Sequence, residues 1–347
     1  MMKVFIFGAG ASLASQNDSN RIGESQKAPL VDDLFKPQYW SYAEQLGFTG
    51  DDFVEYHNAV VSGCPLEQLL TDKWQAILQK KHRMTMDAER KDFGRITFYI
   101  WWLLQNVSRT YSSENLYRIF FKKLKDRDEL FGVINFNYDT LLDRALEEIY
   151  GRTFLRIEDY LSSFPYLKPH GSVNWFILKR TSDPAIQQGE VAIDIKARIS
   201  VASSRFFFDP LEMGNPEMWL PSHSALNDLD VIASSRFKNQ YAYPLVLLPL
   251  TSKMYEQFVG FKQQIIDAAK RIIAEATEIY LVGYRAADEV IKEIFETVKL
   301  NTPLYVVNRG DETRKIGNDI LTWKRELKST KGWDTGFAGF IEDYFKT

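Results

Sequence analysis

The sequence predicts an α/β fold, in which a mostly parallel sheet carries helices on both faces and a helical module is inserted into it. Two observations predict this fold. Short apolar segments typical of buried strands alternate with segments whose apolar residues recur at helical spacing. The first strand segment also ends in two closely spaced glycines, which is typical of Rossmann-like nucleotide-binding sheets.

The expected strands are short apolar runs rich in β-branched and aromatic residues. The first, residues 4–7, is too short for a helix and begins almost at residue 1. Further strands are expected at 130–136, 166–168, 245–248, 279–282 and 304–307.

Helices are expected where apolar residues recur every three to four positions, at 140–150, 258–276 and 287–300. Over a hundred residues separate the first two strands and read mostly as helices, including 65–80 and 88–108. We therefore expect one nucleotide-binding domain spanning 1–347, with a helical insertion at about 13–128 and a mixed insertion at about 179–243.

Composition limits the class of protein. The net charge is −3 and the isoelectric point about 5.9, so no direct nucleic-acid binding is expected. Cys64 is the only cysteine, which excludes an intrachain disulfide and a cysteine-rich zinc site. The longest strongly apolar run, 98–104, is too short to cross a membrane, and no signal peptide is recognised, so a cytoplasmic protein is expected.

The first candidate site follows the first strand and reads Gly8-Ala9-Gly10-Ala-Ser12. The glycines allow a tight turn and a close approach of the backbone to a pyrophosphate, and Ser12 adds a hydroxyl. The dehydrogenase fingerprint requires a third glycine where this chain has Leu13, which argues against a dehydrogenase.

The second candidate site is Asn137 with Asp139, directly after the strand at 130–136. Ligands of doubly wound sheets bind at the carboxyl ends of strands, and alternate residues should face the same way. The alternative is structural, with Asp139 capping the next helix and Asn137 closing the turn.

The third candidate is His170, fixed in a loop between Pro169 and Gly171. An imidazole titrates near neutral pH, so a rigidly held histidine is a candidate general base. The alternative is a histidine that hydrogen-bonds backbone at a strand end. The other three histidines have no such setting, and no metal site is expected from their spacing.

The last two expected strands also end in candidate ligand groups. Gly283-Tyr284-Arg285 follows the strand at 279–282, and Asn308 follows the strand at 304–307. The glycine allows close approach of a ligand, and the asparagine can hydrogen-bond ribose hydroxyls.

These five motifs, in this order, resemble those of the sirtuin superfamily. The resemblance implies NAD+ as substrate, with Gly8, Ala9, Gly10 and Ser12 as its phosphate-binding turn. It implies Asn137 near the nicotinamide ribose, Asp139 near the carboxamide and His170 as the catalytic histidine. It also implies Gly283, Tyr284 and Arg285 as the second glycine turn and Asn308 at the adenosine ribose.

The chain departs from the protein deacylases of that superfamily. It lacks their four zinc cysteines, residues 28–35 do not match their Gly-x-Pro-x-Phe-Arg loop, and no acyl-lysine-binding segment is found. The sequence is therefore more similar to the zinc-free, bacterial sirtuin-like branch, whose studied members hydrolyse NAD+ as effectors of antiphage defence.

The resemblance implies an NAD+ glycohydrolase that needs no metal and depletes NAD+ in antiviral defence. The alternatives are an NAD-dependent deacylase or ADP-ribosyltransferase, or a catalytically silent NAD or ADP-ribose sensor. Because an unrestrained hydrolase would kill its host, a homo-oligomer or a partner ATPase from the same defence locus is expected to control it. The aromatic segments 98–104 and 206–208 are the expected contact surfaces, with burial in a core as the alternative.

Overall fold

The computed structural model describes residues 2–16, 22–48, 51–79, 83–162, 165–180, 217–221, 240–246, 259–329 and 332–346. The chain divides into two compact units. Unit 1 comprises Met1–Leu30, Val107–His170 and Phe258–Thr347, and unit 2 comprises Val31–Asn106 and Gly171–Gln257. The bounds of unit 2 differ from those expected for the two insertions, because residues 13–30 and 107–128 belong to unit 1.

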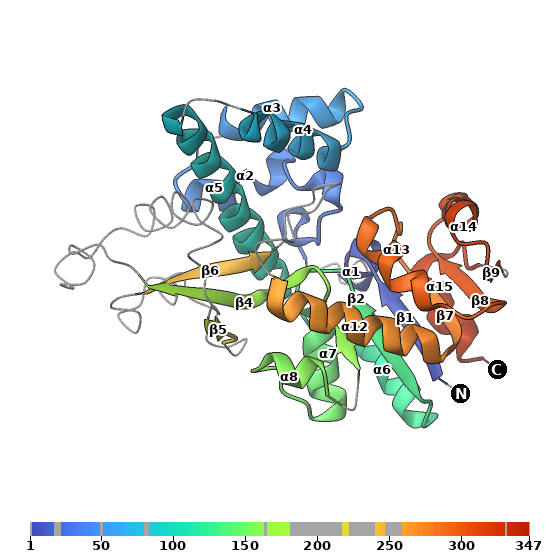
Figure 1. Cartoon of the computed structure of the whole chain (residues 1–347). Coiled ribbons are helices and arrows are strands. Elements are labelled where there is room, and N and C mark those ends of the chain that lie inside the picture. Colours follow the sequence, from blue (N-terminus) through green and yellow to red (C-terminus); the bar gives the residue numbers. More distant parts are fainter. Residues whose placement is uncertain are drawn as a thin grey trace. The chain divides into compact units, whose positions relative to one another are not determined.

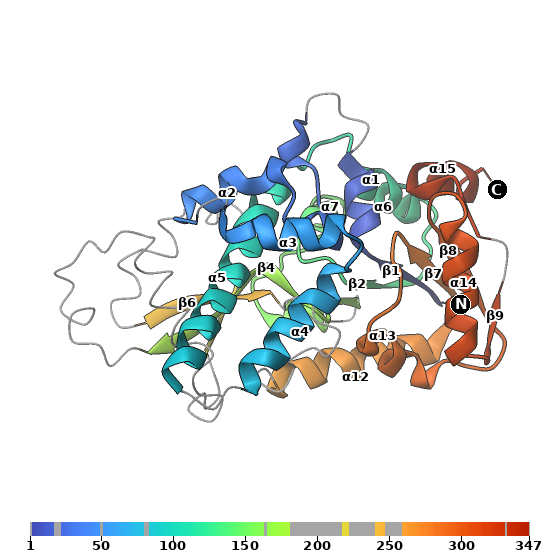
Figure 2. The same ribbon diagram turned by 90° about the horizontal axis from the view of Figure 1, so that it is seen from above.

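Unit 1 contains a six-stranded parallel sheet in the order β3-β2-β1-β7-β8-β9 (Figure 1). Its strands are β1 (Met2–Phe7), β2 (Phe131–Asn135), β3 (Tyr166–Leu167), β7 (Ala276–Val282), β8 (Thr302–Val307) and β9 (Leu327–Ser329). The chain runs outward from β1 to β3, then returns to the other side of β1 and runs outward again. The strand order therefore reverses between β1 and β7, which Figure 2 shows as neighbours.

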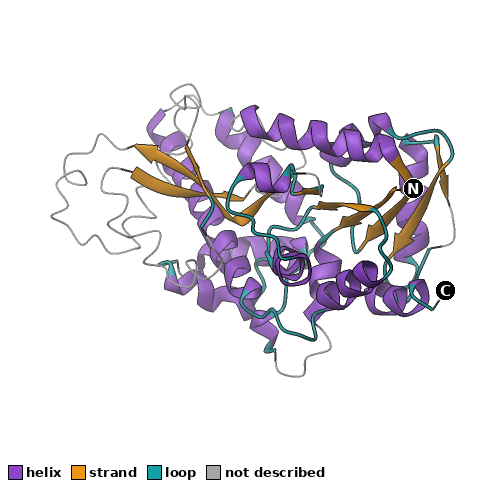
Figure 3. Cartoon of the chain, turned by 90° about the horizontal axis from the view of Figure 1, so that it is seen from below, coloured by secondary structure: helices purple, strands orange, loops and turns teal. Residues whose placement is uncertain are grey.

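Helices cover both faces of this sheet (Figure 3). They are α1 (Ala9–Gln16), α6 (Leu116–Asp126), α7 (Leu141–Tyr150), α8 (Ile157–Tyr160), α12 (Val259–Glu275), α13 (Glu289–Ile294), α14 (Glu312–Trp323) and α15 (Gly336–Tyr344), with short 3-10 turns η1 (Glu24–Gln26) and η7 (Phe295–Thr297). This arrangement confirms the predicted α/β fold with a Rossmann-like parallel sheet.

The core of unit 1 follows from the alternation of side chains along β1. The Phe5 ring packs edge-on against Phe120 of α6 at 5.0 Å, and Phe7 contacts Phe337 of α15 at 5.8 Å. Val4 and Ile6, on the opposite face, are fully buried on the side where α12 contacts β1, β3 and β7. All four side chains are fully buried, so β1 is the central strand of a sheet covered on both faces.

Unit 2 combines helices with a three-stranded antiparallel sheet in the order β5-β4-β6. Its elements are η2 (Val31–Asp33), η3 (Pro37–Tyr39), α2 (Trp40–Gln45), α3 (Asp51–Val61), α4 (Leu66–Leu78), α5 (Arg83–Ser108), β4 (Gly171–Arg180), β5 (Glu217–Trp219) and β6 (Gln240–Val246). The last two residues of α5 belong to unit 1. Trp101 of α5 donates its indole N–H to the Val173 carbonyl of β4 at 2.8 Å and so joins the helix to the sheet.

Several expectations are corrected. Of the strand expected at 245–248, residues 245 and 246 belong to β6, which pairs antiparallel with β4 and is no part of the parallel sheet, while residues 247 and 248 lie outside the described residues. Residues 287–300 form a helix only from Glu289 to Ile294, followed by a 3-10 turn. The aromatic segment 98–104 is buried in unit 2 and offers no contact surface. Residues 206–208 and most of the expected mixed insertion lie outside the described residues.

The two glycine turns of unit 1 are joined by backbone hydrogen bonds at the point where the strand order reverses. Gly10 donates its N–H to the Gly283 carbonyl at 3.0 Å, and Gly8 donates to the Val282 carbonyl at 3.0 Å. Gly283 has a φ of +59°, and a Cβ there would lie 2.2 Å from the Ala11 nitrogen. The end of β7 can therefore approach α1 this closely only with glycine at position 283.

We expect Gly283→Ala to cost more stability than Gly151→Ala, a matched control. Gly151 has a similar φ of +66°, but no atom lies within 4 Å of the position that a Cβ would take, so it measures the backbone cost alone, roughly 1–2 kcal/mol. Gly283→Ala adds the cost of displacing a backbone, about 2 kcal/mol more. Urea unfolding of both variants tests this, and equal losses would show that the close approach is not a constraint.

Candidate functional site

All five sequence motifs of the candidate site lie in unit 1, at the carboxyl ends of neighbouring strands. Gly8–Ser12 follows β1, Asn137 and Asp139 follow β2, and His170 follows β3. Gly283–Arg285 follows β7, and Asn308 follows β8. In open parallel sheets, ligands bind at this edge beside the point where the strand order reverses. The two glycine turns, after β1 and β7, lie at that point.

The phosphate-binding turn expected after β1 leads directly into α1, which begins at Ala9. Ala9 and Gly10 are partly exposed, whereas Ser12 is buried. The start of a helix attracts anions, because its aligned peptide dipoles give that end a partial positive charge. The turn thus presents partly exposed backbone at the positive end of a helix.

Ser12 lies at the centre of a buried hydrogen-bond cluster. Its hydroxyl donates to Asp139 Oδ2 at 2.8 Å and lies 3.1 Å from the Tyr117 hydroxyl. The Asn137 side-chain amide donates to the Ser12 hydroxyl at 3.0 Å and to the Gly8 carbonyl at 2.9 Å. These bonds fasten the segment after β2 to the turn after β1.

Asp139 also caps α7, since its Oδ1 accepts the N–H of Leu141 at 3.1 Å. Both Asp139 and Asn137 therefore make structural contacts, as the structural alternative for these two residues predicted. A carboxylate has about four acceptor positions, and the described residues fill two of those on Asp139, so capping does not use all of them. Burial raises the pKa of Asp139, an effect that the Lys168 ammonium and the Ser12 and Leu141 donors oppose.

Asn137 keeps its oxygen available. Its amide nitrogen and backbone N–H are bonded to the protein, but among the residues that the structure describes no group donates to its Oδ1. The side chain is about 5% exposed. Asn137 can thus accept a hydrogen bond from a ribose hydroxyl or a water at the sheet edge.

Tyr117 was not singled out from the sequence, because it is one aromatic residue on the buried face of α6. Burial raises the pKa of its hydroxyl well above the usual value, and the Asp139 carboxylate adds to this. The hydroxyl therefore stays protonated. It donates to Ser12, whose own proton goes to Asp139.

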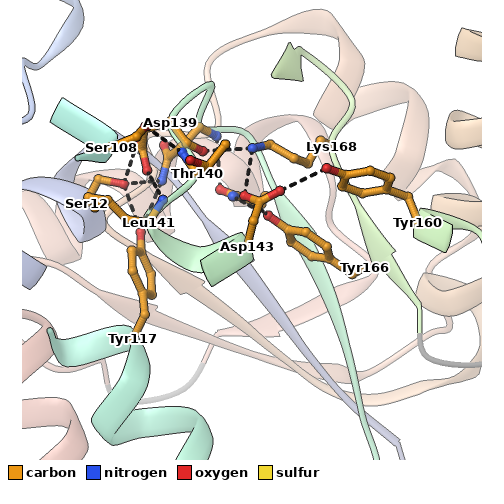
Figure 4. A network of polar contacts seen from close by, with 12 residues as sticks. Ser12, Ser108, Tyr117, Asp139, Thr140, Leu141, Asp143, Tyr160, Tyr166 and Lys168 are labelled. Carbon is orange, nitrogen blue, oxygen red and sulfur yellow. Dashed lines mark hydrogen bonds and ion pairs between the residues drawn. The ribbon is translucent and has the colours of Figure 1, made fainter. Parts of the chain in front are cut away.

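Beside this cluster lies a fully buried ion pair that the sequence did not indicate (Figure 4). Lys168 Nζ lies 2.9 Å from Asp143 Oδ2 and donates to the Asp139 carbonyl at 2.8 Å. Asp143 also accepts the hydroxyls of Tyr160 at 3.0 Å and Tyr166 at 2.7 Å. The pair ties β3 to the start of α7 and so fixes Asp139 from below.

His170 lies in the turn after β3, as expected, and is about 6% exposed. Its ring packs edge-on against Phe136 at 4.7 Å and is stacked with Tyr138 at 5.9 Å. Its Nε2 lies 3.5 Å from Asp288 Oδ2, a contact that sequence reasoning missed. The imidazole is thus held by aromatic rings from one strand end and a carboxylate from another.

The ends of β7 and β8 come together through Glu312, at the start of α14. Glu312 Oε1 lies 3.5 Å from the Arg285 guanidinium, and its Oε2 lies 3.5 Å from the Asn308 amide. Asn308 is half-buried, and Arg285 is exposed. This group of polar side chains lies on the opposite side of the glycine turns from His170 in the strand order.

Two further observations concern classes of site. Within the described ranges, no three histidine, cysteine, aspartate or glutamate side chains gather as metal ligands would. In the same part of the chain, no helix has both the length and the apolar character needed to span a membrane. His82 and His223 lie outside the described residues.

Comparison with known proteins gives structural neighbours but no sequence relatives. The sequence matches no family model, and a search of curated proteins gives no match. A mutant Sir2 homologue in complex with 2′-O-acetyl ADP ribose aligns with a TM-score of 0.46 and 11% identity, over 99% of this chain and 90% of that one. A second mutant, with ADP ribose, gives 0.45 and 11% over the same shares, and Sir2 bound to an acetylated peptide gives 0.40 and 13% over 99% and 92%.

These neighbours are sirtuin homologues.

We expect Lys168→Met to lower the free energy of unfolding by about 3–5 kcal/mol, because it leaves the Asp143 carboxylate buried without its partner. Adding Asp143→Asn should recover part of the loss, since it removes the unpaired charge while the amide oxygen accepts one tyrosine hydroxyl and the amide nitrogen donates to the other. Lys346→Met removes an exposed pair with Asp343 and should cost less than about 1 kcal/mol. Urea unfolding that finds Lys168→Met as mild as Lys346→Met would contradict this role for the buried pair.

Proposed function

We propose that this protein is an NAD+ glycohydrolase, which cleaves NAD+ to nicotinamide and ADP-ribose. One observation carries the proposal. The glycine turns, Asn137 and His170 follow neighbouring strands and lie at one sheet edge, beside the reversal of strand order. A dinucleotide with its pyrophosphate on the glycine turns would extend along this edge in both directions.

In the proposed complex, the pyrophosphate lies at the start of α1, on the backbone of Ala9 and Gly10. The adenosine ribose lies toward Asn308, with Glu312 and Arg285 beside it. The nicotinamide ribose lies on the other side, toward Asn137 and His170. Asp139 accepts the carboxamide N–H on the acceptor positions that Ser12 and Leu141 leave unused.

The cleavage of NAD+ requires few catalytic groups from the protein. The nicotinamide of NAD+ is a positively charged leaving group, so the bond from the ribose to the ring nitrogen can break without an acid. The bonding electrons go to that nitrogen, and the ribose passes through an oxocarbenium-like state, as in other glycoside cleavage. A water held by Asn137 then forms the new C–O bond, and its proton passes to His170 and on to solvent. Positioning and charge complementarity supply most of the rate.

The role in antiphage defence is part of this proposal and rests on the resemblance of the motifs to the zinc-free sirtuin-like branch. Depletion of NAD+ stops the metabolism of an infected cell. Such an activity requires control, and we propose that control comes from assembly of the chain or from a partner ATPase.

We expect His170→Ala to lower the rate of NAD+ cleavage by roughly 10²- to 10⁴-fold through loss of the general base. Asn137→Ala should lower it comparably by releasing the ribose and the water. His57→Ala is the matched control, because His57 lies in unit 2, packed edge-on against Trp40. Release of nicotinamide, followed by chromatography, measures the rate. Unchanged turnover in folded His170→Ala would exclude the mechanism.

We expect no useful deacylation of lysine peptides. The reason is that the sequence has neither the zinc cysteines nor the acyl-lysine segment of the deacylases. An acetyl-lysine peptide incubated with the protein and NAD+ is analysed by mass spectrometry. Stoichiometric deacetylation would favour the deacylase alternative, while NAD+ binding without any cleavage would favour the sensor.

We expect NAD+ cleavage to depend on assembly. Light scattering over a concentration series, with nicotinamide release measured on the same samples, should show specific activity rising with oligomer size. A monomer whose specific activity is constant at every concentration, and which retains no partner in affinity purification from its host, would contradict control by assembly.

A further inference from the structure

Asp288 is a charged residue that the structure places against the candidate general base. Its Oδ2 lies 3.5 Å from His170 Nε2, and only about 10% of its side chain is exposed. The two residues come from different strand ends, His170 from β3 and Asp288 from β7. Their contact therefore depends on the folded sheet and not on local sequence.

Both carboxylate oxygens of Asp288 are held. Oδ1 accepts the backbone N–H groups of Val290 at 2.9 Å and Ile291 at 3.2 Å, which caps the start of α13. Oδ2 accepts the hydroxyl of Tyr284. With one oxygen fixed by the helix and the other by a tyrosine, the carboxylate keeps its orientation toward His170.

Tyr284 is held in turn by the same aromatic group that holds the histidine. Its ring stacks on Phe136 with centroids 4.4 Å apart and an angle of 13° between the planes. Phe136 also contacts His170 edge-on. Asp288 and Tyr138 are thus two titratable groups that the described part of the chain places against His170. Tyr284 acts through Asp288, and Lys168 is directed to Asp143 and the Asp139 carbonyl.

We propose that Asp288 is the positioning carboxylate of His170 and that Tyr284 is the clamp that orients it. The inference deepens the proposed function and rests on it for the reaction served. As His170 takes a proton from the attacking water, the neighbouring negative charge stabilises the imidazolium. The proton then leaves His170 for solvent.

Asp288→Asn tests the proposal without removing the helix cap, because an amide oxygen caps a helix as well as a carboxylate does. Asp311→Asn is the matched control, since Asp311 is exposed, precedes α14 and makes no side-chain cap. Tyr284→Phe removes only the clamping hydroxyl and keeps the ring stacked on Phe136.

The first measurement follows protonation of His170 by NMR in histidine-labelled full-length protein, with the signal assigned from the His170→Ala spectrum. Loss of an opposite charge at this distance should move the midpoint of protonation to lower pH by about one unit in Asp288→Asn. Tyr284→Phe should move it in the same direction or broaden the signal. Asp311→Asn should leave it unchanged.

The second measurement is the pH profile of NAD+ cleavage. In Asp288→Asn, we expect its acidic limb to move with the NMR midpoint and kcat to fall about tenfold, with KM for NAD+ nearly unchanged. If Asp288 only supported the fold, its substitution would lower the stability of the protein without moving the acidic limb of the pH profile.

The two measurements distinguish failure of the positioning role of Asp288 from failure of the proposed NAD+ cleavage. An unmoved NMR midpoint in folded Asp288→Asn overturns the positioning role, whether or not the protein cleaves NAD+. A moved midpoint in a protein that does not cleave NAD+ supports the coupling of Asp288 to His170 and overturns the proposed reaction. A moved midpoint with an unmoved pH profile shows that His170 is not the base and overturns the role of Asp288 in catalysis.

Discussion

The close approach of two backbone turns, after β1 and after β7, is the constraint on which the rest of the site depends. The Gly10 N–H to Gly283 carbonyl bond brings the turns together where no Cβ fits. Because these strands are neighbours at the reversal of strand order, their turns define the middle of the sheet edge. Every other candidate residue takes its position from that middle, with Asn137 and His170 on one side and Asn308 on the other.

The buried polar network holds in place the side chains that this backbone arrangement brings to the site. Burying Lys168 and Asp143 together gains little net stability, because desolvation offsets their attraction. What the pair does here is connect β3 to α7, and through the Asp139 carbonyl it holds the segment that also carries Asn137. The Ser12 and Tyr117 hydroxyls close the network from the β1 side. A site that works by positioning needs such support, since small displacements of a reacting group greatly reduce its rate.

The sequence predicted the parts of the site that local chemistry determines. Gly8, Gly10 and Gly283 are readable because tight turns restrict the residue type, and His170 because proline and glycine flank it. Tyr117, Lys168 and Asp288 were missed because their roles come from partners far along the chain. Tyr117 occurs in an ordinary apolar helical pattern, Lys168 precedes a proline, and Asp288 precedes a helix as many capping residues do. The sheet expected for the strand at 245–248 is wrong for the same reason, since an apolar run does not indicate which strand it pairs with.

The two carboxylates of the site differ in what surrounds them, and this difference assigns their roles. Asp139 accepts a hydroxyl and a backbone N–H, and burial raises its pKa while Lys168 opposes that rise. It is suited to hold a neutral amide in a fixed place. One carboxylate oxygen of Asp288 caps α13, and the other faces the imidazole of His170. A carboxylate beside a base favours the protonated base, so proton transfer belongs to His170 and Asp288, which follow β3 and β7, and recognition of the carboxamide to Asp139, which follows β2. The two functions are thereby kept on different strand ends of one sheet edge.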